Sequence, residues 1–84
     1  MKTLTVYTKP NCGYCANAKA YLTQNDIAFT EVDISQNEEK RNWLVESGFK
    51  TLPVIYAGDA PLVNGGWSAL KNMRKNEIME RLEE

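Results

Sequence analysis

The chain has 84 residues, 43% hydrophobic and 25% charged, which is the composition of one small globular domain that we place over residues 1–84. Ten basic and eleven acidic residues give a net charge of −1, which argues against nucleic-acid binding, and no apolar run reaches membrane-spanning length. Because an alternating pattern starts directly after Met1, we expect no signal peptide. We expect a cytoplasmic protein without a membrane partner, and we expect it to be a monomer.

Apolar periodicity and turn residues predict alternating strands and helices. Asn11 is expected to cap the first helix, and Ser35 and Glu38 form the pattern of a capping box for the second, which Gly48 should end. The chain after Gly65–Gly66 is expected to be helical in two pieces. The predicted strands span 3–8, 28–33, 53–56 and 62–63, the first two helices span 12–25 and 35–47, and the last break lies at 74–76.

This order, βαβ then α then ββα, predicts an α/β protein with a four-stranded mixed sheet flanked by helices. The first two strands should be parallel because a helix connects them, and the last two should form an antiparallel hairpin. Helical spacing predicts which side chains face the sheet. These are Tyr14, Ala18, Tyr21 and Leu22 in the first helix, Trp43 and Leu44 in the second, and Leu70, Met73, Ile78, Met79 and Leu82 at the end.

Cys12 and Cys15 lie two residues apart, where the first strand ends and the first helix begins. A bridge that closes so small a loop constrains the unfolded chain little, so the spacing favours chemistry over stabilisation. The unpaired N–H groups of the helix N-terminus, together with Lys9, favour the thiolate of Cys12. Since Cys15 lies about one turn further in, we expect Cys12 to attack a disulfide and Cys15 to resolve the mixed disulfide.

The cysteine pair could also serve as half of a zinc site or as a pair of inert core residues. A tetrahedral zinc site needs four ligands, and because the sequence has no histidine and no third cysteine, such a site has to be shared between two chains. Two buried, inert cysteines need no partner at all, although the junction of strand and helix is a poor place to bury Cys12. The sequence leaves both alternatives open.

Three segments resemble the signatures of a known family. Val6–Cys15, followed by Ala18–Lys19, resembles the active-site segment of the glutaredoxins and of the glutaredoxin-like redoxins that serve ribonucleotide reductase. Thr51–Leu52–Pro53 resembles their second signature, whose proline is cis and faces the disulfide, and Gly65–Gly66 resembles their double glycine. The resemblance implies the thioredoxin fold and a thiol–disulfide oxidoreductase that carries electrons to protein disulfides, with ribonucleotide reductase as the expected partner.

The resemblance also implies a groove for glutathione, which would be a co-substrate rather than a tightly bound cofactor. Lys9 and Lys40 match the positions that approach the glycine carboxylate of glutathione. Tyr14 matches the aromatic residue that flanks the groove, and Leu52 matches the residue whose backbone pairs with the cysteinyl part of the ligand. The residues expected at the groove are Lys9, Tyr14, Lys40, Thr51, Leu52, Pro53, Gly66 and Ser68, and we expect no metal ligands.

Two departures from the glutaredoxin pattern bear on the reductant and on an alternative function. Trp67–Ser68–Ala69 lacks the carboxylate that holds the γ-glutamyl amino group in many glutaredoxins, and Trp67–Ser68 is similar to the Trp-Ser of the redoxins that thioredoxin reductase reduces. The reductant is therefore expected to be glutathione or thioredoxin reductase. Gly13 replaces a common proline, and some members with glycine there hold an iron–sulfur cluster between two subunits. A glutathione-dependent iron–sulfur dimer is the alternative function.

Overall fold

A computed structural model describes residues 2–83. Its four-stranded sheet has the order β2-β1-β3-β4. β1 (Leu4–Thr8) is parallel to β2 (Thr30–Asp33) and antiparallel to β3 (Val54–Ala57), which pairs in turn with β4 (Ala60–Pro61) in an antiparallel hairpin. The predicted mixed sheet, with its βαβ unit followed by a hairpin, is confirmed.

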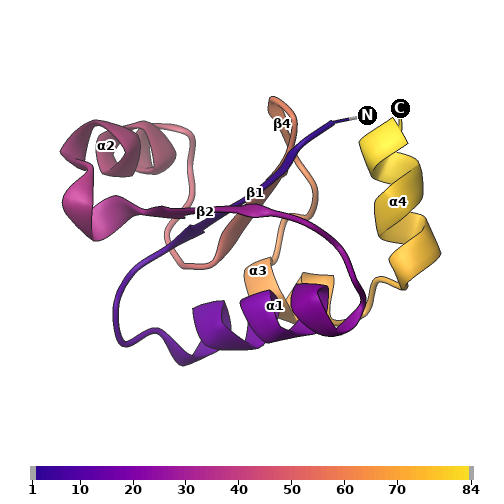
Figure 1. Ribbon diagram of the computed structural model, residues 1–84. Coiled ribbons are helices and arrows are strands. Elements are labelled where there is room, and N and C mark those ends of the chain that lie inside the picture. Colours follow the sequence, from indigo (N-terminus) through magenta and orange to yellow (C-terminus); the bar gives the residue numbers. More distant parts are fainter. Residues whose placement is uncertain (1, 84) are drawn as a thin grey trace.

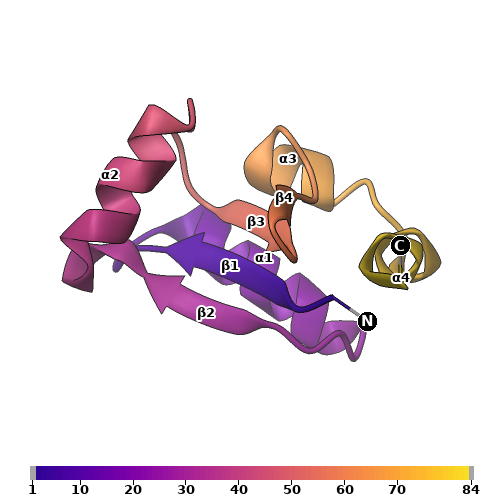
Figure 2. The same cartoon turned by 90° about the horizontal axis from the view of Figure 1, so that it is seen from above.

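The helices cover both faces of the sheet (Figures 1 and 2). α1 (Gly13–Gln24) and α3 (Gly66–Leu70) lie on one face, and α2 (Glu38–Glu46) lies on the other, after a short 3₁₀ turn at Ile34–Gln36. α4 (Lys75–Glu83) lies at the end of the sheet, beside the start of the chain. Within residues 2–83, no helix is long and apolar enough to cross a membrane.

Alternation along the strands divides the buried side chains into two clusters, one on each face of the sheet. The larger cluster joins the sheet to α1, α3 and α4, so it holds α1 and the cysteine pair at its start in place. It consists of Leu4, Val6, Ala18, Leu22, Ile27, Ile55, Ala57, Leu62, Leu70, Ile78 and Leu82. The smaller cluster lies beneath α2 and consists of Tyr7, Ile34, Leu44, Val54 and Tyr56.

Trp43, which we expected in the core, lies at the surface with 36% of its area exposed. Its ring packs against those of Tyr7 and Tyr56, with ring centroids 5.7 and 5.2 Å apart. The ammonium of Lys40 lies 5.2 Å from the centroid of the Trp43 ring. The prediction was wrong because helical spacing identifies the inner face of α2 but not how far the sheet extends beneath it. Trp43 covers the margin of the smaller cluster instead of filling it.

The second helix begins later than predicted. Ser35 donates its backbone N–H and its hydroxyl to the Asp33 carboxylate, at 2.9 and 2.6 Å, so it belongs to a 3₁₀ turn and does not cap the helix. Asn37 caps α2 instead, because its side-chain oxygen accepts from the N–H of Lys40 at 3.0 Å. Gly48 follows the end of the helix with a φ of 94°, as the prediction of a glycine stop requires.

The hairpin is tighter than predicted. Gly58 adopts a φ of 67° and lets a two-residue turn join Ala57 to Ala60, so β4 lies at 60–61 rather than 62–63. The buried Leu62 still donates its N–H to the Ile55 carbonyl at 2.8 Å, just beyond the strand. The first residues of β2 and β3 also fall later than predicted, by two residues and by one.

The C-terminal region forms two helices, as predicted, but the break falls at 71–74 instead of 74–76. Trp67 packs edge-on against the ring of Tyr21 with centroids 5.7 Å apart. The Tyr21 hydroxyl donates to the backbone carbonyl of Met73 within the break. These contacts hold α3 and the break against α1.

Candidate active site

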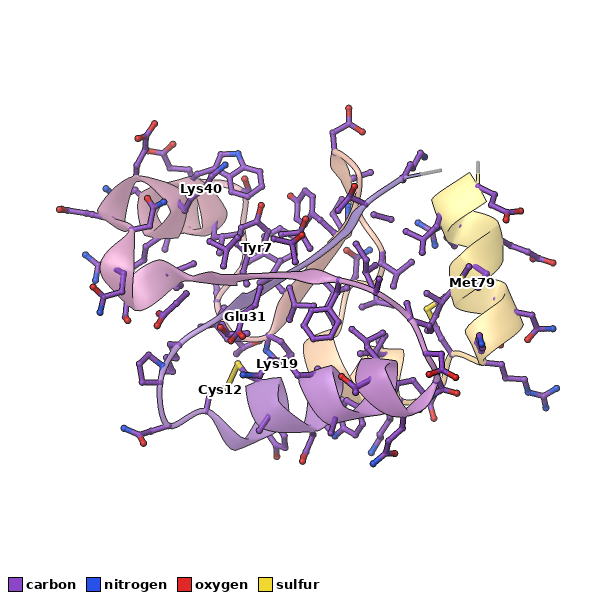
Figure 3. The ribbon with its side chains drawn as sticks, viewed as in Figure 1. Tyr7, Cys12, Lys19, Glu31, Lys40 and Met79 are labelled. Atoms are coloured by element: carbon purple, nitrogen blue, oxygen red, sulfur yellow. A yellow bond between two sulfur atoms is a disulfide. The ribbon has the colours of Figure 1, made fainter. Side chains whose placement is uncertain are left out.

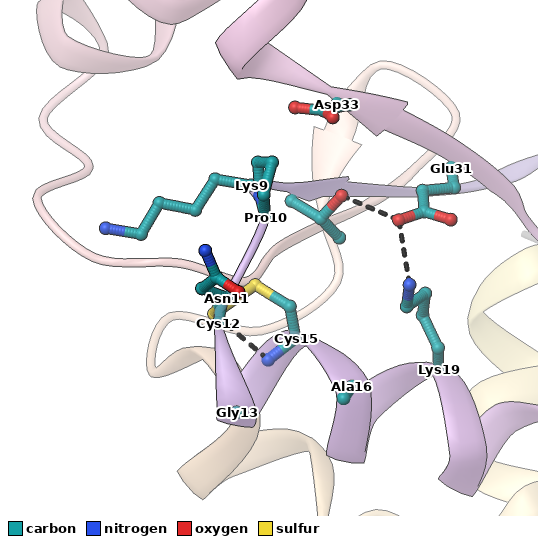
Figure 4. Close-up of a pocket in the computed structure, with 11 residues that line it drawn as sticks. Lys9, Pro10, Asn11, Cys12, Gly13, Cys15, Ala16, Lys19, Glu31 and Asp33 are labelled. Atoms are coloured by element: carbon teal, nitrogen blue, oxygen red, sulfur yellow. Dashed lines mark hydrogen bonds and ion pairs between the residues drawn. A yellow bond between two sulfur atoms is a disulfide. The ribbon is translucent and has the colours of Figure 1, made fainter.

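The cysteine pair forms a disulfide at the N-terminus of α1, with Cα atoms 5.2 Å apart (Figure 4). Asn11 has a φ of 61°, and the extended residue Cys12 is the N-cap, with its Sγ accepting from the N–H of Cys15 at 3.2 Å. The prediction of Asn11 as the cap was therefore wrong by one residue. The same geometry places a backbone donor on the sulfur of Cys12, where it would stabilise a thiolate.

The two sulfurs differ in accessibility. Cys12 is partly exposed, whereas Cys15 is 2% exposed on the inner face of α1. Because a partner molecule can approach only the first of them, the arrangement fits one attacking and one resolving thiol. It also argues against a pair of cysteines that are both buried and inert.

A polar pocket of about 530 Å³ opens on one side of the disulfide, between α1 and the ends of β1 and β2. One carboxylate oxygen of Glu31 accepts from Lys19 Nζ at 2.9 Å and from Thr8 Oγ1 at 2.8 Å. These hydrogen bonds, that from Lys19 first, lower the pKa of Glu31, so its carboxylate is charged at neutral pH. The other charged residues that line this pocket are Lys9 and Asp33.

A second pocket, of about 240 Å³, contains three of the predicted groove residues. Lys9, Thr51 and Leu52 line it together with Arg41 and Lys50. All of its charged lining residues are basic, and its remaining lining is mostly apolar. Such a pocket suits a ligand that carries a carboxylate next to an apolar or backbone portion.

A third pocket, of about 420 Å³, brings Thr51, Pro53 and Gly66 together. The Leu52–Pro53 peptide bond is cis, as predicted, and Pro53 is buried. Gly66 has a φ of 56°, and a Cβ at this position would lie 3.0 Å from the Pro53 carbonyl oxygen. The second glycine of Gly65–Gly66 is therefore required by both backbone conformation and close approach.

Three of the residues predicted at the groove line none of these pockets. Tyr14, which helical spacing put on the face of Ala18 and Leu22 but which its match to the groove predicted to be exposed, is 65% exposed. The ammonium of Lys40 lies over the ring of Trp43 on the same helix, and Figure 3 shows Lys40 on α2, away from Cys12. Ser68 is exposed on α3.

Arg41 and Glu31 were not among the site residues predicted from the sequence. The signal for Arg41 was available, since it precedes the buried Leu44 by three residues and helical spacing places both on one face. Glu31 gave no such signal, because its partners Lys19 and Thr8 come from other elements and meet it only when β1 and β2 pair.

Comparison with known proteins agrees with this geometry. The glutaredoxin family model matches residues 4–61. The chain belongs to the glutaredoxin family. It is 34% identical over 85 residues to glutaredoxin 1 of Rickettsia conorii, an alignment covering 98% of this chain and 81% of that protein. It is also 39% identical over 56 residues to the glutaredoxin-like protein NrdH of Lactococcus lactis subsp. cremoris, covering 67% of this chain and 78% of that one.

Among solved structures, glutaredoxin from Brucella melitensis is similar with a TM-score of 0.73 and 32% identity, over 100% of this chain and 94% of that one. The thioredoxin fold is thereby confirmed. As a glutaredoxin-family protein with a Cys12–Cys15 pair, the chain is a thiol–disulfide oxidoreductase. Its relatives include both proteins named glutaredoxin and proteins named NrdH, as the mixed signatures of the sequence predicted.

Proposed function

We propose that this glutaredoxin-family protein is a dithiol electron carrier that reduces protein disulfides, with Cys12 as the attacking thiol and Cys15 as the resolving thiol. The difference in accessibility carries the proposal. Cys12 is partly exposed at the helix N-terminus, where backbone donors favour the thiolate, and Cys15 is 2% exposed one turn further in.

The reaction has two steps that balance. The Cys12 thiolate attacks one sulfur of the substrate disulfide, forms a mixed disulfide, and releases the first substrate thiolate, which takes up a proton. Cys15 then loses its proton and attacks Cys12 Sγ, which closes the disulfide and releases the second substrate thiolate. One substrate disulfide is reduced and the cysteine pair is oxidised, so an external reductant must return two electrons.

The substrate chain is proposed to lie beside Thr51, Leu52 and Pro53, where the Leu52 backbone would pair with it as an added strand. Gly66 supports this path through its close approach to Pro53. The three basic residues of the second pocket, which include Lys9, would hold carboxylates of the substrate or of glutathione. In the sequence, Tyr14, Lys40 and Ser68 match further glutathione contacts, and they remain predictions.

Ribonucleotide reductase is the proposed protein substrate, and either glutathione or thioredoxin reductase the proposed reductant. Ribonucleotide reductase as the substrate is supported by the similarity to proteins named NrdH and by the pair Trp67–Ser68. The absence of a carboxylate at Ala69, where many glutaredoxins hold the γ-glutamyl amino group, favours thioredoxin reductase, and the basic pocket favours glutathione. We place the protein in the cytoplasm as a monomer.

The test follows NADPH oxidation with a disulfide-bonded ribonucleotide reductase as substrate, once with glutathione and glutathione reductase and once with thioredoxin reductase. We expect turnover in at least one arm, and its loss in the Cys12→Ser variant. The comparison of the two arms identifies the reductant. If neither arm reduces this substrate but insulin is reduced, the partner is wrong and the carrier function stands; if no protein disulfide is reduced, the proposed function is wrong.

A further inference from the structure

The buried thiol has a charged neighbourhood that the two-step reaction leaves unexplained. Cys15 is 2% exposed, so loss of its proton would place a thiolate where water cannot solvate it well. Cys15 and Lys19 are four residues apart on α1, and both line the polar pocket. Residues at this spacing lie on one helix face, with Cβ atoms about 5–6 Å apart. Lys19 is therefore the cation next to the resolving thiol on its own helix.

Lys19 is held in place by the two strands opposite. Its Nζ lies 2.9 Å from Glu31 Oε2, and the same oxygen accepts from the hydroxyl of Thr8, which is 2% exposed. Figures 3 and 4 show Lys19 reaching from α1 toward Glu31 on β2, on the side of the disulfide where the polar pocket opens. The charged groups facing Cys15 across this pocket are Lys19 from its own helix, Glu31 and Asp33 from β2, and Lys9 from the preceding loop.

We propose that Lys19 and Glu31 bias in opposite directions how readily Cys15 gives up its proton when it resolves the mixed disulfide. Lys19 favours the thiolate and Glu31 opposes it, so each charge offsets the effect of the other on Cys15. Both are positioning residues that act through Cys15 and form no bond with the substrate. The proposal rests on the dithiol function proposed above.

Lys19 and Glu31 carry opposite charges, so removing one or the other should shift the equilibrium between the Cys15 thiol and thiolate in opposite directions. Removing the Lys19 ammonium leaves the Glu31 carboxylate unopposed and disfavours the Cys15 thiolate. Removing the Glu31 charge leaves the ammonium unopposed and favours that thiolate. By Coulomb's law, a unit charge at about 6 Å in a medium close to water changes an acid dissociation constant by about threefold to tenfold, and a more distant charge changes it less. The two single substitutions should therefore move the ionisation of Cys15 in opposite directions, each by up to about this factor.

A purely structural role predicts a different result. The side chains of the pair are 36% and 40% exposed, and ion pairs this exposed contribute little to stability. If the pair only fastened α1 to β2, Lys19→Met and Glu31→Gln would break the same contact. The two variants would then have the same effect on the site, and the pKa of Cys15 would not shift in opposite directions.

The experiment is a pH titration of the reduced 84-residue protein, with the ¹³Cβ signals of both cysteines followed by NMR. The variants are Lys19→Met, which keeps the apolar stem, Glu31→Gln, which keeps the shape, and the double variant, with Lys19→Arg as the conservative replacement. Glu39→Gln and Lys71→Met, which alter exposed charges that do not line the pocket, are the matched controls.

We expect the pKa of Cys15 to rise in Lys19→Met, to fall in Glu31→Gln, and to lie near the parent value in the double variant and in Lys19→Arg. The release of the second substrate thiol should be slower in Lys19→Met and faster in Glu31→Gln. Shifts of the same sign in both single variants, or shifts no larger than those of the controls, would overturn the proposal. Because the titration uses neither substrate nor reductant, its outcome is separate from that of the proposed function.

Discussion

Replacement of Gly66 by alanine tests how the double glycine supports the substrate groove. With its φ of 56°, an alanine at this position would have a left-handed backbone conformation, which destabilises the fold by roughly 1–2 kcal/mol for an L-residue. Its Cβ would also lie 3.0 Å from the carbonyl oxygen of Pro53, so either α3 or the groove segment must move by a few tenths of an ångström. Gly48 provides a matched control, because its φ is 94° but nothing lies within 4 Å of a Cβ there.

We therefore expect Gly48→Ala to lose only the backbone contribution, roughly 1–2 kcal/mol, and Gly66→Ala to lose more. For a domain of this size each kcal/mol lowers Tm by about 4–8 °C. Thermal unfolding and the reduction of a disulfide substrate, measured on both variants, separate the two effects. Turnover should fall severalfold in Gly66→Ala and stay near the parent value in Gly48→Ala. Equal losses of stability and of turnover in the two variants would refute the argument from close approach.

Three further predictions concern single positions. Alkylation of the reduced protein against pH should show Cys12 reacting well below pH 8 and before Cys15, because backbone donors at the helix N-terminus stabilise its thiolate; reaction of Cys15 first would reverse the roles. Ala69→Asp should raise the rate of glutathione-dependent reduction by about tenfold by providing a partner for the γ-glutamyl amino group, and an unchanged rate would show that the missing carboxylate is unimportant. The hydrogen bonds from Lys19 and Thr8 lower the pKa of Glu31, so their small contribution to stability is present above the ordinary glutamate range and is lost as the pH falls through the lowered pKa. Chemical denaturation should accordingly find Glu31→Gln slightly less stable than the parent at pH 7, with a difference that shrinks as the pH is lowered.

Features encoded by a few neighbouring residues could be predicted from the sequence. The strand that ends before Pro10, the helix that begins around Cys12, and the stop at Gly48 each depend on local backbone preferences. The mixed sheet followed from the order of these elements, because a helix between two strands makes them parallel and a tight turn makes them antiparallel. The errors at Asn11 and Ser35 are shifts of one or two residues, caused by side chains bonding to a different nearby backbone group.

Features that depend on how distant elements meet could not be predicted in this way. Thr8 and Glu31 are 23 residues apart, and their hydrogen bond exists only because β1 and β2 pair in one particular register. The exposure of Trp43 depends on the extent of the sheet beneath α2, which no local pattern records. The basic pocket likewise gathers Lys9, Arg41 and Lys50 from three separate segments.

The central claim is that an accessible Cys12 attacks and a buried Cys15 resolves, and trapping of the mixed disulfide tests it most directly. The Cys15→Ser and Cys12→Ser variants are reduced, mixed with a disulfide substrate, quenched with acid, and analysed by intact mass and peptide mapping. The account predicts that Cys15→Ser accumulates a stable adduct on Cys12, whereas Cys12→Ser forms almost none. Adducts that accumulate on Cys15, or equally on both variants, would contradict it.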